Sequence, residues 1–106
     1  MLYVKTMALL EQLESELRVQ GLWSSQKPSA AAMNDSSPFS CETMPFENWV
    51  QFIFLPKMHE LIDRALPLPE KIAIAPMAHH VWGGKPELHT IIFIFEELDR
   101  LLSEQR

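Results

Sequence analysis

Residues Pro45 to Ala65 read PFENWVQFIFLPKMHELIDRA and form the most apolar run in the chain. Their large apolar side chains recur at steps of three and four, which is the period of one face of an α-helix. The stripe consists of Phe46, Trp49, Val50, Ile53 and Phe54, followed by Met58, Leu61, Ile62 and Ala65. Only Gln51 is polar between Trp49 and Leu55, as is typical of a helix covered on several sides. We therefore predict a buried central helix over residues 45–65.

A buried β-strand is the main alternative for this run, because Trp, Val, Phe and Ile also favour strands. The run has no two-residue alternation, which argues against a strand. Pro56 lacks the N–H that would bond to the carbonyl of Phe52, and its ring crowds the preceding turn. We expect the central helix to be kinked or broken at Pro56. The uncharged stretch between Glu47 and Lys57 is far too short to span a membrane.

The composition is that of a small globular protein in one domain, residues 1–106. Its net charge is -5, from 14 acidic and 9 basic residues. An acidic surface repels phosphate backbones, so nucleic acid is an unfavourable partner. Cys41 is the only cysteine, which excludes an internal disulfide and fits a reducing compartment. We expect a cytoplasmic protein that does not bind membranes.

Two further amphipathic helices flank the central one. Residues 2–20 predict the first, and Gly21 favours a Schellman motif in which Leu22 packs against Leu17. Pro86 begins the second, whose apolar stripe is Leu88, Ile91, Ile92, Phe95, Leu98 and Leu102.

Shorter elements complete the predicted fold. Residues 22–44 are rich in Ser and Pro but contain large apolar anchors, so we expect an ordered strap over the bundle with a short helix from Pro28 to Met33. Residues 66–69 are extended because each proline disfavours helix in the residue before it. A short helix follows from Pro76 to Trp82. The fold class is thus all-α: a small helical bundle of three long helices plus short helical turns.

Several fragments resemble a known family. They are Leu22-Trp23, Pro28-Ser29, Pro38-Phe39, Thr43 to Phe46, Trp49 to Met58, Pro67-Leu68-Pro69 and Pro76-Met77. Together they resemble the YqcC-like family of small bacterial proteins of unknown function, and the resemblance spans residues 4–102. It implies an all-helical fold and supplies no catalytic residues.

The resemblance also brings an enzyme name, because genes of this family often neighbour a tRNA pseudouridine synthase gene and are sometimes given its name, tRNA pseudouridine synthase C. Such an enzyme needs a mixed α/β scaffold that holds a nucleophilic Asp in a basic cleft for a flipped base. This chain has no strand pattern, few residues and an acidic balance. We therefore reject synthase activity and retain an accessory role beside a tRNA-modifying enzyme as a hypothesis.

The aromatic residues supply the candidate binding site. Most of them are expected in the core, since apolar stripes on helices usually pack inside. A bundle of 106 residues is nevertheless small to enclose three Trp and six Phe, so part of this surface is expected to form an apolar groove. The predicted groove residues, with two polar ones beside them, are Trp23, Phe39, Trp49, Gln51, Phe52, His59 and Trp82.

Other chemistry finds little support. The histidines lack the spacing of a zinc site, and His79 and His80 point in different directions on a helix. Cys41 has no cationic residue beside it in the sequence that would activate it as a nucleophile. We predict no catalytic residue, metal or cofactor.

Two main functions are therefore considered. The first is a non-catalytic module that binds another protein, or a second copy of itself as a homodimer, through the groove. The second is a small-ligand or minor enzymatic role in a pocket near Pro56, with Gln51, His59 or His80 as polar contacts.

Overall fold

The computed structural model describes residues 2–104, and every regular element in that range is helical. The α-helices are α1 (Leu2–Val19), α2 (Ala30–Met33), α3 (Phe46–Trp49), α4 (Leu55–Asp63), α5 (Ala75–Trp82) and α6 (His89–Ser103). A π-helical turn, η2 (Val50–Phe54), lies between α3 and α4, and the 3₁₀ turns are η1 (Pro38–Ser40) and η3 (Pro86–Leu88). The predicted all-α class is confirmed.

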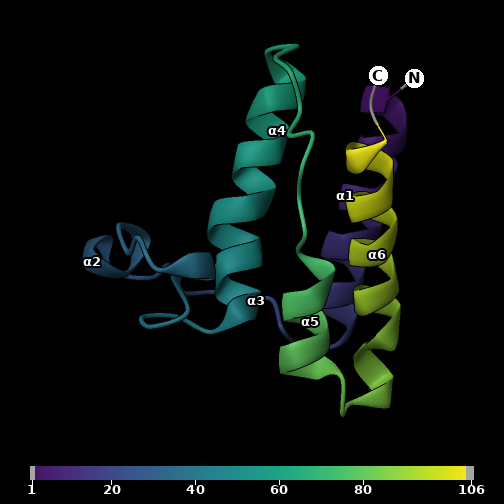
Figure 1. The fold of residues 1–106 in the computed structure, drawn as a ribbon. Coiled ribbons are helices and arrows are strands. Elements are labelled where there is room, and N and C mark those ends of the chain that lie inside the picture. The colour runs from purple at the N-terminus through teal and green to yellow at the C-terminus, as the bar shows by residue number, and fades with distance from the viewer. Residues whose placement is uncertain (1, 105–106) are drawn as a thin grey trace.

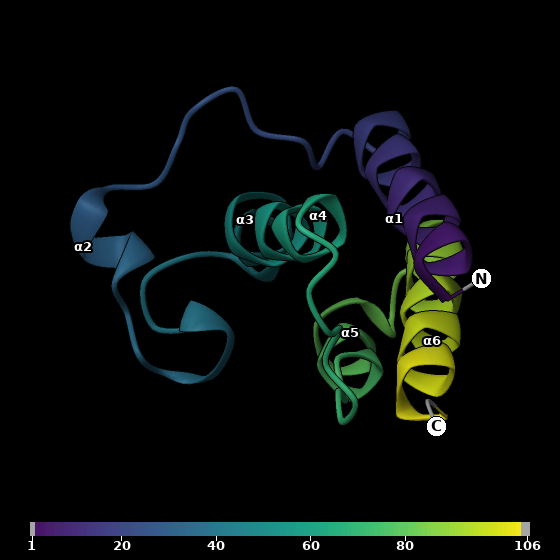
Figure 2. The same cartoon turned by 90° about the horizontal axis from the view of Figure 1, so that it is seen from above.

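Helices α1 and α6 run antiparallel and side by side, so the start of α1 lies next to the end of α6 (Figure 1). Helix α5 packs against α6, and the central helix contacts α1 through α4. Viewed from above, α3 and α4 stand apart from α6, with α5 on the lower side between them (Figure 2). The core fills the space among these helices and includes Leu10, Leu13, Leu17, Val50, Met58, Trp82, Ile91, Phe95, Leu98 and Leu102.

The end of α1 has the predicted Schellman motif. Gly21 has φ 74°, the left-handed conformation that glycine adopts without strain. The Leu22 N–H donates to the Leu17 carbonyl at 2.8 Å, and the Gly21 N–H donates to the Arg18 carbonyl at 3.1 Å. This turn ends α1 and leads into the strap, residues 22–44.

The central helix is continuous from Phe46 to Asp63. The irregularity expected at Pro56 lies just before it, in the π turn, where the Leu55 N–H donates to the carbonyl of Val50 five residues earlier. Phe54 and Leu55 keep helical dihedral angles. The π turn inserts one residue into the helix, and we attribute its position to Pro56, because the wider turn moves carbonyl oxygens away from the proline ring.

A second Schellman motif ends α4, and its left-handed residue is Ala65 with φ 52°. The Leu66 N–H donates to the Leu61 carbonyl at 2.8 Å. The chain then runs without helix through residues 66–74, with Leu68 and Ile74 buried, and begins α5 at Ala75. The extended Pro67-Leu68-Pro69 segment and the short helix ending at Trp82 agree with the prediction.

The strap, residues 22–44, loops out beside the central helix instead of crossing over α1 and α6 (Figure 2). It contains α2, which is shorter than the predicted helix and is capped by the Ser29 hydroxyl accepting from the Ala32 N–H at 3.1 Å. Ala32 and Met44 are its buried apolar anchors. No described helix is long and apolar enough to cross a lipid bilayer.

Candidate functional site

An apolar groove of about 320 Å³ lies between the central helix and the irregular segment 66–74. Its lining residues are Phe39, Trp49, Ile53, Phe54, Lys57, Met58, Pro69, Ile72, Ala73 and Ile74. Lys57 is the only lining residue with a charged side chain. The groove therefore offers a hydrophobic floor with a single cation, which suits an apolar ligand or peptide better than a polar substrate.

The floor of the groove comes from the helix on both sides of Pro56. Trp49, Ile53 and Lys57 follow each other at steps of four residues, and Phe54 and Met58 form a second row. Residues four apart on a helix are neighbours on its surface, so these rows share one face. The π turn lies within this face, and π turns often occur at functional sites. The groove lies beside Pro56, where a pocket was expected, but none of the polar contacts expected there, Gln51, His59 or His80, lines it.

The opposite wall of the groove, segment 66–74, is held in place by hydrogen bonds to α1 and α6. The Tyr3 hydroxyl donates to the Leu66 carbonyl at 2.6 Å, which fixes the start of the segment to α1. At its end, the Ala75 N–H donates to Asp99 Oδ2 at 2.8 Å, which fixes it to α6. Burial raises the pKa of Asp99 above its ordinary value, although the N–H bonds from Ala75 and Ile74 oppose the shift. The wall is therefore anchored at both ends.

The strap contributes the remaining wall through Phe39. Its ring meets Trp49 edge-on at 4.9 Å between centroids and Phe46 edge-on at 5.7 Å. Trp49 stacks on Phe54 at 5.6 Å, so aromatic contact continues from the strap to the groove floor. Phe39 has φ 56° and Ser40 has φ 50°, which is an unfavourable conformation for side chains other than glycine. The aromatic contacts hold this strained turn against the groove.

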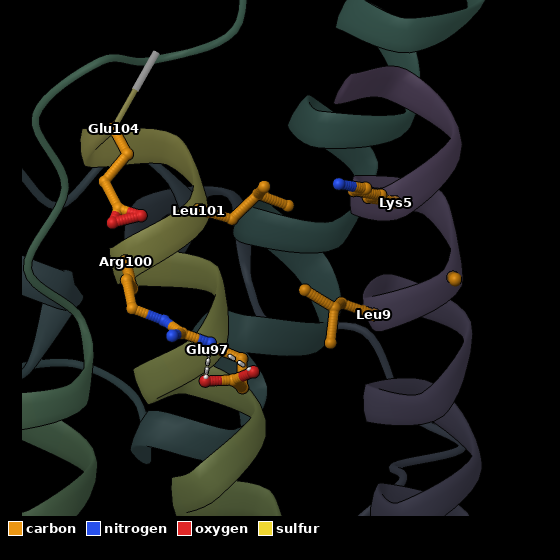
Figure 3. A pocket seen from close by; sticks show the side chains of 7 residues that line it. Lys5, Leu9, Glu97, Arg100, Leu101 and Glu104 are labelled. Atoms are coloured by element: carbon orange, nitrogen blue, oxygen red, sulfur yellow. Dashed lines mark hydrogen bonds and ion pairs between the residues drawn. The ribbon is translucent and has the colours of Figure 1, made fainter. Parts of the chain in front are cut away.

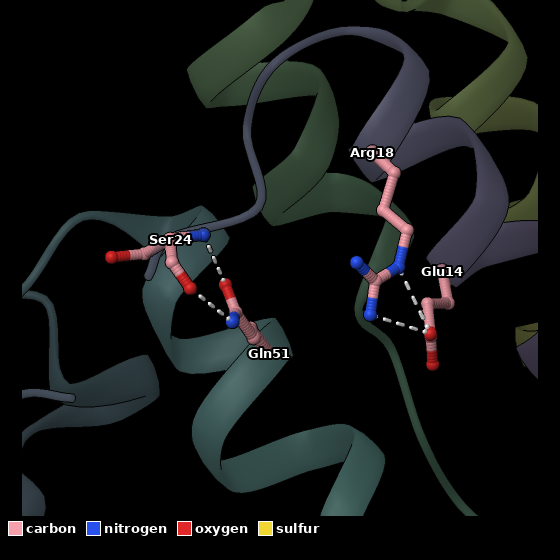
Figure 4. A network of polar contacts seen from close by, with 4 residues as sticks. All are labelled: Glu14, Arg18, Ser24 and Gln51. Atoms are coloured by element: carbon pink, nitrogen blue, oxygen red, sulfur yellow. Dashed lines mark hydrogen bonds and ion pairs between the residues drawn. The ribbon is translucent and has the colours of Figure 1, made fainter. Parts of the chain in front are cut away.

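Gln51 holds the strap against the central helix and is buried (Figure 4). Its Oε1 accepts from the Ser24 N–H at 2.7 Å, and its Nε2 donates to the Ser24 carbonyl at 2.8 Å. Both ends of the amide are thus engaged with the backbone. The sequence interpretation of Gln51 as a polar contact for a ligand needs correction, because its hydrogen bonds serve the strap.

Asp35 organises the far part of the strap. Its carboxylate accepts from the Ser37 N–H at 2.9 Å, the Ser37 hydroxyl at 2.7 Å and the Thr43 hydroxyl at 2.8 Å. These hydrogen bonds, with the Ser37 N–H foremost, lower the pKa of Asp35. The central helix is capped by Pro45, which makes no side-chain hydrogen bond to it.

The other predicted groove residues lie elsewhere. Trp82 is 2% exposed and packs in the core at 5.0 Å from Phe46. Trp23 lies under the Arg18 guanidinium at 4.3 Å from the ring centroid, at the end of α1. His59 borders a separate hollow between α1 and α4, and Phe52 is half-buried without lining the groove. The structure thus brings together Phe39 and Trp49 from the predicted set.

Sequence reasoning missed the second wall of the groove. Ile72, Ala73 and Ile74 belong to LPLPEKIAIAP, where prolines predict extension but not the packing partner. The apolar Ile-Ala-Ile run was the available signal. Within residues 2–104, no group of three or more His, Cys, Asp and Glu residues is arranged to hold a metal ion. The histidines contact other groups: His79 Nε2 lies 2.9 Å from Glu96, and His89 Nε2 lies 3.1 Å from the Gly83 carbonyl.

Comparison with known proteins gives a consistent picture of the fold. Residues 5–101 match the family DUF446, which is described as tRNA pseudouridine synthase C. The solution NMR structure of YqcC from Escherichia coli superposes with a TM-score of 0.86 at 29% identity, covering 99% of this chain and 91% of that one. An uncharacterised protein of Haemophilus influenzae is 35% identical over 92 residues, 87% of each chain.

Two further relatives differ in name and in how much of their length this chain matches. The uncharacterised protein YqcC of Escherichia coli is 32% identical over 96 residues, which is 90% of this chain and 88% of that protein. A Pectobacterium carotovorum protein named tRNA pseudouridine synthase C is 37% identical over 76 residues, which is 72% of this chain but only 20% of that protein. Four-fifths of the protein with the enzyme name thus lies outside the matched region.

Proposed function

The chain belongs to the YqcC-like family DUF446, and we propose that it is a non-catalytic interaction module whose groove receives an apolar segment of another protein. The groove itself carries this proposal. It is lined by apolar side chains apart from Lys57, and no His, Cys, Asp or Glu side chain lines it. A surface of this kind can bind apolar side chains, but it offers no convergent acid, base or nucleophile for chemistry.

The partner we propose is a tRNA pseudouridine synthase. The Pectobacterium relative contains a region similar to this chain within a much longer protein that is named as that enzyme. In that protein the covalent link keeps the similar region close to the rest of the enzyme. Where the two parts are separate chains, a binding interface is needed to keep them equally close. An apolar groove provides such an interface.

The isolated chain is not expected to form pseudouridine. The catalytic domain such a reaction requires binds RNA in a basic cleft, whereas this chain has a net charge of -5. Tritium release from labelled uridine in tRNA measures the reaction directly. Turnover by the purified chain above a no-protein control would contradict this part of the proposal.

Binding to the synthase of the same organism tests the main proposal. We expect wild-type protein to bind in isothermal titration calorimetry, and I72E to lose at least about tenfold in affinity, because a charge in an apolar pocket must be desolvated. V81E is the matched control, since Val81 is a β-branched residue on α5 that is 36% exposed and does not line the groove. Equal affinity of I72E and V81E would remove the groove from the interface, and no binding by wild-type protein would remove the synthase as partner.

A small amphipathic carboxylate is the second candidate occupant of this groove. Lys57 supports it, because its exposed ammonium lies at an otherwise apolar groove and makes an exposed ion pair to Glu60 at 3.7 Å, which is weak in water. Decanoate would then raise the melting temperature of wild-type protein by mass action and raise that of K57Q less. Identical shifts for the two proteins, or none, would eliminate this occupant.

A further inference from the structure

The outward surface of α1 carries large apolar side chains that no other element covers. Val4 is 66% exposed and Val19 is 72% exposed. Together with Ala8 and Ser15 they follow one another at steps of four, seven and four residues, which places them in one stripe along the helix. Helix α1 therefore presents a narrow line of apolar and small residues to solvent, flanked at its middle by the exposed polar residues Glu11 and Gln12.

Helix α6 presents a complementary stripe. Phe93 is 59% exposed, and Glu97, Arg100 and Glu104 follow it at steps of four, three and four. An exposed phenylalanine on a helix whose core side is already complete has no role in the packing of this chain. Its exposure instead suits contact with another protein surface.

A hollow of about 470 Å³ lies between these two stripes (Figure 3). Leu9 and Leu101 are directed toward each other across it, with Lys5 beside them on α1. The complete lining is Lys5, Ala8, Leu9, Glu97, Arg100, Leu101 and Glu104. The two antiparallel helices thus form a channel lined by three apolar and four charged side chains.

The charges at this channel are incompletely paired. Arg100 donates to both carboxylate oxygens of Glu97, at 2.6 and 2.7 Å. Lys5 and Glu104 have no ion-pair partner within residues 2–104. Because the helices are antiparallel, Lys5 near the start of α1 and Glu104 just after α6 lie at the same end of the pair (Figure 3).

We propose that a second copy of this chain covers this face, related by a two-fold axis parallel to α1 and α6. That operation places α1 of each copy against α6 of the other, again antiparallel and at the same height, as in an up-down four-helix bundle. Lys5 then faces Glu104 of the second copy. Phe93 packs against the small-residue stripe of the opposite α1.

This face is separate from the groove proposed to bind the synthase, because the two surfaces share no lining residue. Charge complementarity favours a second copy over an unrelated helix, since Lys5 and Glu104 each gain an ion-pair partner at once. The dimer and the groove therefore succeed or fail independently.

Sedimentation velocity over protein concentrations from micromolar to millimolar tests the proposal. The wild-type chain should show a weight-average mass that rises from the monomer value of 12.3 kDa toward that of a dimer. F93E should weaken association by at least about tenfold, because a carboxylate replaces the large apolar side chain that α6 contributes to the contact. V81E, on α5 outside this face, is the matched control and should associate as wild type does. Far-UV circular dichroism checks that each variant remains helical.

A charge exchange tests the orientation of the copies. K5E and E104K should each weaken association, and the double variant K5E/E104K should restore it, because the pair is re-formed between copies. A monomer at every concentration would overturn the proposal. An F93E chain that associates as strongly as V81E would also overturn it, and so would a double variant as weak as the two single ones.

Discussion

Helix α6 and the middle of the central helix are comparably apolar, yet the structure buries them differently. In α6 the stripe side chains Ile91, Phe95, Leu98 and Leu102 are enclosed between α1 and α5. In the central helix, Trp49 and Ile53 are only half-buried, because one flank is covered by an extended segment and a strap instead of a helix. The same apolar composition thus builds a core where helices surround it and a groove where they do not.

The largest difference between the two regions is expected on truncation of a leucine or isoleucine. Leu98 is fully buried, so L98A should lower the free energy of unfolding by about 2–5 kcal/mol through lost burial and a cavity. I53A removes a half-buried side chain at the groove and should cost about 1 kcal/mol or less. Urea unfolding of both variants measures the contrast, and equal losses would show that the groove is packed like the core.

The hydrogen bonds between Gln51 and Ser24 are expected to hold the start of the strap rigidly against the central helix. Q51A removes both bonds and leaves two backbone groups of Ser24 to find water, at a cost of about 1–2 kcal/mol. Amide hydrogen exchange should accelerate at Ser24 and stay unchanged in α6. Unchanged protection of Ser24 in Q51A would mean that the aromatic contacts of Phe39 alone hold the strap.

Asp99 joins the two regions, since it lies on α6 and accepts from the Ala75 N–H at the end of the groove wall. Its other oxygen, Oδ1, is buried and has no hydrogen-bond partner within residues 2–104, consistent with burial as the cause of its raised pKa. A folded pKa above the unfolded value of 3.8 favours the protonated native state. The contribution of Asp99 to stability is therefore full below the unfolded pKa and is lost as the pH rises through the folded pKa.

The variant D99N tests this assignment. Asparagine keeps an acceptor for the Ala75 N–H without a charge, so D99N should remove this part of the pH dependence, while D99A should lose the bond and about 1 kcal/mol. Urea unfolding at pH values from about 3 to about 7 gives the comparison. A pH dependence identical in wild type and D99N would contradict the raised pKa.

The smallest effect concerns the two Schellman motifs. The motif at the end of α1 uses Gly21, whereas the motif that leads from α4 into the groove wall uses Ala65 at φ 52°. A65G should relieve left-handed strain of about 1–2 kcal/mol against an entropic cost of about 0.5–1 kcal/mol, for a net gain of about 0–1.5 kcal/mol. Thermal unfolding by circular dichroism measures it, and a lower melting temperature would show that Ala65 is not strained.

Local signals in the sequence predicted most of the elements. Gly21 marked the end of α1, the prolines marked the extended segment and α5, and helical periodicity identified the three long helices. The π turn was not predictable in form, because Pro56 requires some irregularity without specifying which one. A kink, a break and a π turn would each accommodate the proline, and the structure has the π turn at Val50–Phe54.

The candidate site was less predictable than the fold. Trp49 and Trp82 both occur in apolar helical runs, and only the arrangement of neighbouring elements leaves Trp49 at the groove and Trp82 in the core. The role of Gln51 could not be predicted either, because its hydrogen-bond partner Ser24 is distant in the sequence. Exposure and long-range hydrogen bonds depend on tertiary packing, which periodicity does not encode.

Methyl NMR during titration with the tRNA pseudouridine synthase tests the central claim most directly. The account predicts chemical-shift changes that concentrate on the isoleucines of the groove, Ile53, Ile72 and Ile74, while Val4 and Val19 on the outer face of α1 remain unchanged. Changes at the valines of α1 with none at the three groove isoleucines would contradict the claim that the groove is the binding surface.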